Sequence, residues 1–424
     1  MTHPERHRMT RQLSVHDIGL HFGGDAEAGA TIGRFLDTLD WPPALLGLGE
    51  PTHGVEAFPL LRNEALQYLV EHHGYRSIAL EIDCVAAAVV DDYVRTGQGE
   101  LAEVVAAGFN HGFDAWQSNH ELVAWLRDYN AGRDPRYQVH CYGFDAPTEI
   151  TAAPSPRATF LGAYAYLLEH LPAERLPHNT ETLDTLLGDD ADWTNPEAML
   201  DPGRSIGHTD RARTLRLAAD DLLAIYTSEA PGLRRASSDT DFERAYLLAR
   251  MAHGLLRYHA AMATPGPGRV SILLGLRDGM MADNLLDIVR IEKHRGPCLV
   301  FAHNSHLQRT ESSWQGHWDG ADFSWRWWSA GAIAAATLDT EYVFIAADYG
   351  QCVNAPAPQD DTRSLHAVLQ AATTDRALFP TRLLTAALDS DVTARVSTDQ
   401  RYGPLSPAAL DGADAVVFIT QVSR

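Results

Sequence analysis

The chain has 424 residues, of which 45% are hydrophobic, so it can bury a large core and is long enough for two structural units. Its 34 Lys and Arg residues stand against 56 Asp and Glu residues, and the net charge of -22 argues against binding to nucleic acid or to anionic membrane surfaces. The four cysteines form no C-x-x-C pair, and no segment is apolar for long enough to act as a signal peptide or to span a bilayer, so we expect a cytoplasmic protein without a disulfide framework.

Five short apolar runs predict buried strands along the chain, and each ends at or next to an ionisable side chain. Helical stretches such as residues 58–73 and 119–129 separate the runs, so the order is β-α-β-α and indicates a parallel sheet. Ligands of open α/β sheets bind outside the carboxyl ends of the strands. One polar strand end is ordinary, but five favour a site there, with these side chains around it: Glu50, Glu81, Asp145, His303 and Asp348.

Residues 151–266 differ in character from the rest of the chain. They begin with a proline-rich stretch, continue through long Ala-, Leu- and Arg-rich helical runs, and end at the sequence TPGPGR. This composition predicts a helical insertion, or cap domain, between strands. We therefore expect residues 1–150 and 267–424 to form an α/β catalytic core, with a central, mostly parallel sheet flanked by helices.

Two short motifs imitate known sites. Residues 47–50 (GLGE) resemble the start of a dinucleotide fingerprint, but position 52 is threonine and Glu50 would occupy the turn that holds pyrophosphate, so we reject nucleotide binding. Residues 203–207 (GRSIG) match the pattern G-x-S-x-G. A nucleophile elbow needs a strand before Ser205 and a helix after it, whereas this segment lies inside the insertion, so we do not expect a catalytic serine.

The strongest chemical signal is the sequence EPTHG at residues 50–54, directly after the first predicted strand. If a helix begins there, Glu50 and His53 share one face, and the carboxylate can hold one imidazole nitrogen while the other addresses water. Further ionisable residues follow at the next helix, at strand ends and at the start of a later helix: Arg62, Glu81, Arg277 and His303.

The run GEPTHGVEAFPLLRNEALQYLVEHHGYRSIALE, residues 49–81, resembles the erythromycin esterase family, whose hallmark is G-E-x-T-H-G followed by an arginine and by a strand that ends in glutamate. Later segments agree with the family in order: WQSNHELVAWLRDYN, VHCYGFD, RDGMMADN and FAHNSH. The resemblance covers residues 45–306, and five motifs in a fixed order are far more specific than any one of them.

This resemblance implies a water-dependent hydrolase that opens the lactone ester of large macrolides, with no covalent serine and no cofactor. An ester hydrolase needs a base that works near neutral pH and positive charge for the developing oxyanion, and the chain can supply both. The residues that the resemblance assigns to catalysis are His53 as general base, Glu50 and Glu81 as groups that orient and polarise it, His303 as a second essential histidine, and Arg62 and Arg277 as conserved arginines.

The arginines and the aromatic residues each have two interpretations. Both arginines can stabilise an oxyanion, or they can pair with carboxylates and only hold the fold together. Five of the nine tryptophans lie in a loop-like stretch, residues 314–328, which is either an apolar wall for a large amphipathic ligand or packing of a loop against the core. The candidate substrate-binding residues are His306, Asn304, Trp116 and Trp325.

Three functions are open at this level. The first is hydrolysis of a carboxylic ester or macrolactone in a small-molecule substrate, a macrolide or another large amphipathic natural product, with neither metal nor cofactor. The second is a tailoring step of natural-product biosynthesis, such as cyclisation, elimination or acyl transfer, driven by the same base. The third is a binding protein or a metal-dependent hydrolase, in which Glu50, His53 and His303 would hold the metal.

Overall fold

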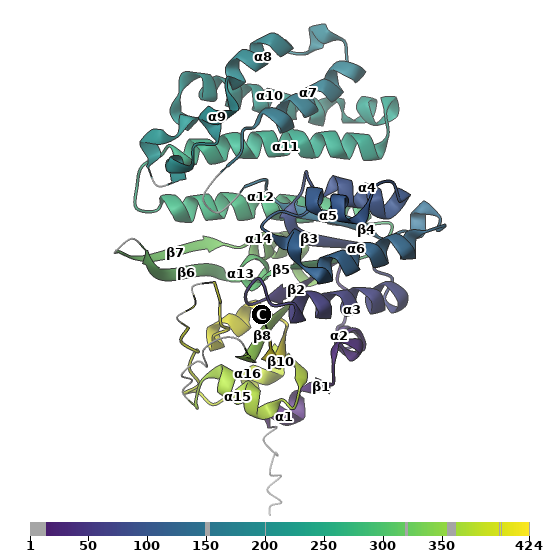
Figure 1. The fold of residues 1–424 in the computed structure, drawn as a ribbon, viewed down its shortest axis with the longest axis vertical. Coiled ribbons are helices and arrows are strands. Elements are labelled where there is room, and N and C mark those ends of the chain that lie inside the picture. Colours follow the sequence, from purple (N-terminus) through teal and green to yellow (C-terminus); the bar gives the residue numbers. More distant parts are fainter. Residues whose placement is uncertain are drawn as a thin grey trace, which may run out of the picture. The chain divides into compact units, whose positions relative to one another are not determined.

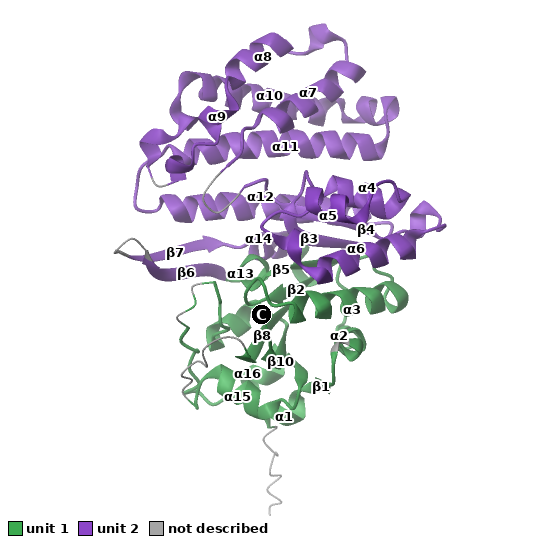
Figure 2. Ribbon diagram, viewed as in Figure 1, with its two compact units in different colours: residues 1–75, 296–310, 338–424 green, residues 76–295, 311–337 purple. Residues whose placement is uncertain are grey.

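The computed structural model describes residues 14–148, 153–199, 201–318, 321–353, 362–397, 399 and 401–423, and Figure 1 labels its helices and strands. The chain divides into two compact units, coloured separately in Figure 2. The first unit comprises residues 1–75, 296–310 and 338–424, and the second unit comprises residues 76–295 and 311–337. Among the described residues, no helix combines the length and the apolar character that crossing a bilayer requires.

The first unit is an α/β structure assembled from three separate stretches of the chain. Its strands are β1 (Leu20–Phe22), β2 (Leu45–Glu50), β5 (Cys298–His303), β8 (Tyr342–Cys352), β9 (Arg376–Pro380) and β10 (Ala415–Val422). Its α-helices are α1 (Val15–Ile18), α2 (Ala28–Leu36), α3 (Ala57–His72), α13 (Asn304–Leu307), α15 (Leu365–Ala372) and α16 (Thr381–Ala387).

Parallel pairing dominates the sheet of the first unit. Strand β2 pairs in parallel with β5 on one side and β8 on the other, and β8 pairs in parallel with β10. Beyond β10, strands β9 and β1 add antiparallel pairs. Every residue of β2 is buried, and such a continuous apolar run is typical of a parallel strand covered on both faces.

The second unit contains two further strands of the main sheet and most of the helices. Strands β3 (Ser77–Asp83) and β4 (His140–Asp145) pair in parallel, and helices α4 (Ala88–Thr96), α5 (Leu101–Gly108) and α6 (Gln117–Asn130) lie between them in sequence. Long helix α12 (Arg269–Glu292) follows the insertion, and α14 (Ala330–Leu338) follows a hairpin. Within the described residues, eight strands make up the main sheet, and the fold is the mostly parallel α/β structure that the sequence predicts.

The predicted insertion, residues 151–266, lies within the second unit, and the regular elements of its described part are all helices. It contains α7 (Arg157–His170), α8 (Thr180–Leu187), α9 (Asp190–Trp193), α10 (Asp210–Ala236) and α11 (Asp239–Met262). These helices enclose a hydrophobic core of their own around Trp193 and Tyr226. The insertion therefore packs as a helical layer, because its amphipathic helices bury their apolar faces against one another.

Two expectations from the sequence are wrong for these strands. Neither Glu81 nor Asp348 ends its strand, because β3 continues to Asp83 and β8 continues to Cys352. The tryptophan-rich stretch is not a loop: strands β6 (Glu311–Trp318) and β7 (Ala321–Trp328) form an antiparallel hairpin with Trp314 opposite Trp325. Where side chains are described, burial alternates along both strands, the pattern of a hairpin with one covered face. The Gly, Asp and Ser residues in this stretch hid that alternation from sequence inspection.

Candidate functional site

Glu50 and His53 form a hydrogen-bonded pair in the first unit. Glu50 is the last residue of β2, and its Oε1 lies 2.6 Å from Nδ1 of His53. Helix α3 begins only at Ala57, so the expected shared helix face is wrong. A turn between β2 and α3 makes the predicted contact instead, and Gly54, with a φ of +82°, supplies the left-handed backbone in that turn.

The direction of this hydrogen bond determines what the imidazole can do. A carboxylate oxygen only accepts, so Nδ1 of His53 donates, and the neutral ring carries its basic lone pair on Nε2. The His53 side chain is 41% exposed, whereas the side chain of Glu50 is 2% exposed. A buried carboxylate that orients a solvent-accessible imidazole is the arrangement that a general base requires.

His303 lies beside this pair, at the end of the neighbouring strand β5. Glu50 and His303 are register partners, and the rings of His53 and His303 are 5.5 Å apart at an angle of 64°. Nδ1 of His303 accepts from the backbone N–H of Ser305 at 3.2 Å, and Nε2 donates to the carbonyl of Pro51 at 3.0 Å. Since a backbone N–H can only donate, His303 is a neutral Nε2–H tautomer that holds the turn carrying His53.

Asn304, predicted to bind substrate, is bound to strand β8. Its Nδ2 donates to the carbonyl of Ala347 at 2.8 Å, and its Oδ1 accepts from the N–H of Ala347 at 3.1 Å. Pairing between β2 and β8 ends at Leu48. Beyond that point, the side-chain amide of Asn304 makes hydrogen bonds to the backbone of β8 in place of β2. The position explains Gly49, because a Cβ there would lie 2.0 Å from Oδ1 of Asn304. Both ends of the amide that we expected to bind substrate therefore bind the backbone.

Two other predicted site residues, Arg62 and His306, are also buried in the first unit. Arg62 lies in α3 and donates from Nε and Nη2 to Oδ1 of Asn63, at 3.0 and 2.8 Å. Its guanidinium stands 4.9 Å from the ring centre of Phe301, a cation–π distance. His306 lies in α13 and is 6% exposed.

In the second unit, Arg277 binds two carboxylates. Its Nε and Nη2 donate to the two oxygens of Asp145, at 2.9 and 2.5 Å, and Nη2 lies 3.5 Å from Oε1 of Glu81. All three side chains are buried, and the two-point contact with Asp145 matches the fork geometry of a guanidinium. The structure thus brings together two predicted catalytic residues, Glu81 of β3 and Arg277 of α12. Asp145, the last residue of β4, lies in contact with Arg277.

An irregularity in strand pairing sets the position of Glu81. The register of β3 against β4 shifts between Leu80 and Asp83, so the chain bulges around Glu81. A bulge re-aims the side chains of the strand that carries it. Gly143 on β4 makes room for the bulge, because a Cβ there would lie 2.6 Å from the carbonyl oxygen of Asp83.

Charge, more than burial, decides the protonation of this cluster. Burial alone lowers the pKa of Arg277, but the charges of Asp145 and Glu81 hold it well above its usual value. Burial raises the pKa of Asp145, and the guanidinium together with hydrogen bonds from His111 and Arg277 leaves it below its usual value. The Asp145–Arg277 pair is therefore fully charged at neutral pH.

His111 belongs to the same cluster and was missed in the sequence. Its Nε2 lies 3.2 Å from Oδ2 of Asp145, and its φ of +59° is in the left-handed region that non-glycine residues rarely adopt. The preceding Asn110 accepts from the backbone N–H of Asp83 at 3.0 Å. The Asn-His-Gly sequence at residues 110–112 was the available signal, since Asn and Gly favour such tight turns.

The two tryptophans predicted to bind substrate lie in different elements of the second unit. Trp116 precedes α6, and its ring centre lies 4.6 Å from that of Phe113, with the two rings tilted by 36°. Trp325 lies on the less exposed face of the hairpin, stacked on Phe323 at 4.0 Å and edge-on to Trp314 at 5.4 Å. Both rings are half-buried.

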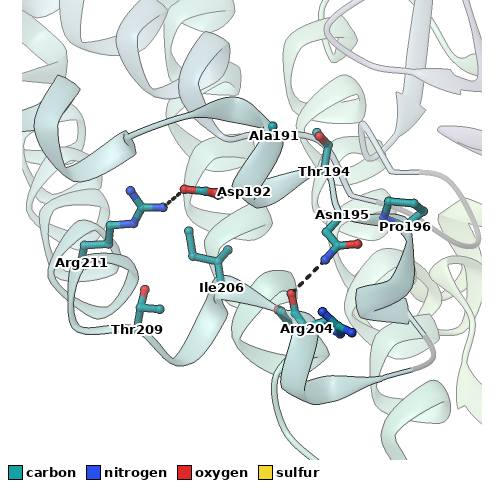
Figure 3. Close-up of a pocket in the computed structure, with 10 residues that line it drawn as sticks. Ala191, Asp192, Thr194, Asn195, Pro196, Arg204, Ile206, Thr209 and Arg211 are labelled. Atoms are coloured by element: carbon teal, nitrogen blue, oxygen red, sulfur yellow. Dashed lines mark hydrogen bonds and ion pairs between the residues drawn. The ribbon is translucent and has the colours of Figure 1, made fainter.

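The G-x-S-x-G match is not a nucleophile elbow. Ser205 lies between two 3-10 turns, residues 202–204 and 206–208, and its hydroxyl donates to the carbonyl of His259 at 3.2 Å. It borders an open pocket of about 630 Å³ in the insertion. In Figure 3, Arg211 turns toward Asp192 in that pocket, where the two form an ion pair. The rejection of a catalytic serine is consistent with these contacts.

The three residues named for a metal site all have partners within the protein. Glu50 and His53 bond to each other, and both ring nitrogens of His303 bond to protein atoms. Across the parts of the chain that the structure describes, no group of three or more His, Cys, Asp or Glu side chains is arranged to hold a metal ion. The contact between Glu50 and His53 is suited to acid–base chemistry.

Comparison of the sequence with known proteins gives a matching family model and a curated relative. The family model described as "Erythromycin esterase" matches residues 70–422. An erythromycin esterase type I from Escherichia coli is 26% identical over 286 residues. That alignment covers 64% of this chain and 64% of the relative, so the chain matches less than two thirds of the relative's length.

Solved structures with similar folds cover nearly the whole chain. A Bacillus cereus protein superposes with a TM-score of 0.70 at 18% identity, covering 96% of each chain. A succinoglycan biosynthesis protein gives a TM-score of 0.66 at 16% identity, covering 97% of this chain and 96% of that one. A mutant of the erythromycin esterase EreC, in its open conformation, gives 0.66 at 19% identity, covering 92% and 93%. At these identities the similarity establishes the fold.

Proposed function

The chain belongs to the erythromycin esterase family, and on this premise we propose that it hydrolyses a carboxylic ester or macrolactone with water activated by His53. The observation that carries the proposal is the 2.6 Å hydrogen bond from Nδ1 of His53 to the buried Glu50, on a ring that solvent reaches. Similarity to the E. coli erythromycin esterase supports a macrolide, or another large amphipathic natural product, as substrate.

The reaction needs one base and no covalent intermediate. Nε2 of His53 removes a proton from water while the oxygen attacks the ester carbonyl carbon, and the carbonyl oxygen becomes an oxyanion. Glu50 stabilises the imidazolium that forms, as a buried carboxylate does for a cationic neighbour. When the carbonyl re-forms, the bond to the alkoxy oxygen breaks and His53 returns the proton to it. The products are a carboxylic acid and an alcohol.

We assign the other predicted residues to supporting roles. His303 holds the turn through Pro51, so it positions His53. Arg62, which lies in the same unit as His53, is proposed to stabilise the oxyanion, and within the second unit Glu81 fixes the guanidinium of Arg277. Removal of one oxyanion donor in other enzymes costs about 100- to 1,000-fold in kcat, which sets the scale expected for Arg62.

Mass spectrometry of reaction products tests the proposal. The purified protein is incubated with a panel of macrolides that includes erythromycin A, and with p-nitrophenyl butyrate as a small ester. Hydrolysis adds the mass of one water molecule, whereas cyclisation leaves the mass unchanged and elimination of water lowers it. We expect water addition by the wild type and a loss of about 100- to 10,000-fold in His53→Ala, the usual contribution of a general base.

A matched variant controls for the loss of a histidine–carboxylate pair as such. His253 in α11 bonds to Asp220 through Nε2 at 2.7 Å, inside the helical insertion. His253→Ala is expected to keep wild-type activity. Full hydrolysis by His53→Ala would refute the mechanism, and products of unchanged or lower mass from the wild type would favour a tailoring reaction instead.

A further inference from the structure

A fully buried carboxylate in the first unit accepts four hydrogen bonds that the proposed reaction does not use. Oδ1 of Asp348 accepts from the hydroxyl of Tyr402 and the N–H of Tyr349, at 2.7 and 2.8 Å. Oδ2 accepts from Nε2 of His366 and the N–H of Leu405, at 2.6 and 2.7 Å. Four donors on one buried carboxylate make a rigid junction, because each lost bond would leave charge unsolvated.

The junction joins elements that are far apart in sequence. Asp348 lies in β8, His366 in α15, and Tyr402 and Leu405 in the segment after them. Arg395 adds a donor to the Tyr402 hydroxyl at 3.2 Å and also binds the carbonyl of Gly350 at 2.8 Å. Residues 402–405 are thus bound to Asp348 at both ends.

Between those two ends, the segment contacts the turn that carries His53. The N–H of Gly403 donates to the carbonyl of Pro51 at 2.8 Å. The same carbonyl accepts from Nε2 of His303 at 3.0 Å. Gly403 packs so closely that a Cβ there would lie 3.3 Å from Cε1 of His303. Pro51 is therefore fixed by two donors, one of which depends on where residues 402–405 lie.

We propose that residues 402–405, clamped by Asp348, are a positioning element for His53 and His303. Asp348 and Tyr402 act through the backbone of Gly403 and do not touch substrate, so both are positioning residues. Their contribution to catalysis rests on the proposed function. Their effect on the orientation of the two imidazoles does not, because it follows from hydrogen bonds within the first unit.

The first test variant is Tyr402→Phe, which removes the hydroxyl from the junction and keeps the ring. We expect kcat to fall about 10- to 100-fold with KM changed less than about 2-fold, since small misplacements of a catalytic group cost rate more than binding. The control is Tyr142→Phe. Tyr142 also donates to a buried carboxylate, Glu292, at 2.7 Å, but in the second unit. It should lose comparable stability and keep its kcat.

The second variant, Gly403→Ala, disturbs the contact without touching the junction. Its methyl group would press on His303, so kcat should fall about 10-fold while the melting temperature stays near that of the wild type. Gly232→Ala is the matched control, because a Cβ at Gly232 in α10 meets nothing within 4 Å. This variant keeps the test decisive if Tyr402→Phe fails to fold.

A spectroscopic measurement separates this inference from the proposed function. The imidazole ¹⁵N shifts of His303, assigned with His303→Gln, should show one Nε2–H tautomer in the wild type and a mixture in both variants. Shifted signals together with a wild type that hydrolyses no probe would support the positioning element and contradict the hydrolase. Unchanged His303 signals and unchanged kcat in both variants would overturn the positioning element.

Discussion

Replacing Arg277 by methionine should reverse the pH dependence of stability in the second unit. The change keeps the length of the side chain and removes the only guanidinium that contacts Asp145 within the described residues. Asp145 is fully buried and Glu81 is 5% exposed, so two buried carboxylates lose a cationic neighbour. Breaking a buried ion pair in this way costs about 3–5 kcal/mol.

The pH dependence follows from the direction of each pKa shift. In the wild type, the pKa of Asp145 lies below its usual value because of Arg277 and His111, so its stabilisation is present above the usual pKa of about 4 and is lost as pH falls through the lower folded value. In Arg277→Met, burial becomes the dominant effect and the folded pKa rises. The variant is then penalised most at neutral pH, and the penalty shrinks as the pH is lowered.

Thermal unfolding between pH 8 and pH 5 measures both effects. An unfolding entropy of about 2.1 cal/mol/K per residue gives about 0.9 kcal/mol/K for 424 residues, so Arg277→Met should melt about 3–6 °C below the wild type at pH 7.5. The gap should narrow toward pH 5. Arg213→Met, which removes an exposed arginine paired with Asp210 at 3.3 Å, should leave the melting temperature nearly unchanged. A gap that is absent at pH 7.5, or that widens on acidification, would refute this reasoning.

Three smaller changes test other parts of the structure. Gly49→Ala places a Cβ 2.0 Å from Oδ1 of Asn304, so it should break the bonds of that amide to β8 and lower the free energy of unfolding by about 2–3 kcal/mol, as seen by denaturant titration against Gly232→Ala. Ser205→Ala should keep wild-type hydrolysis, because the hydroxyl donates to a backbone carbonyl; a loss greater than about 10-fold would contradict this. Asp348 has a pKa held below its usual value, mainly by His366 against the effect of burial, so its stabilisation is present above pH about 4 and lost below. Asp348→Asn should therefore melt below the wild type at pH 7 and approach it as the pH falls toward 2.

Local sequence was sufficient to predict five of the strands and the contact between Glu50 and His53. Continuous apolar runs identified β2, β3, β4, β5 and β8, because strands buried on both faces carry few polar residues. The missed strands are the short strands β1 and β9, the hairpin strands β6 and β7 with their mixed composition, and β10 near the carboxyl end of the chain. The Glu50–His53 contact was predicted from spacing alone, and it forms even though the connecting backbone is a turn and not a helix.

Other features depend on contacts between residues that are distant in sequence. His303 was identified by its motif, but its tautomer depends on the carbonyl of Pro51, 252 positions away, and on the N–H of Ser305. Asn304 follows a strand end, where a ligand was expected, but its amide instead bonds to the backbone of β8 where the pairing with β2 has ended. Sequence could not rank Tyr402 above any other tyrosine.

What the sequence by itself determined about this protein is therefore its class of fold, its family, and the residue types that can perform acid–base chemistry. These follow from apolar periodicity and short motifs, which are local properties of the chain. Only the tertiary structure decided which nitrogen of His53 and of His303 carries the proton, which polar side chains bind the backbone, and which buried groups hold the His53 turn. A hydrogen bond has a direction and a partner, and folding selects that partner from the whole chain.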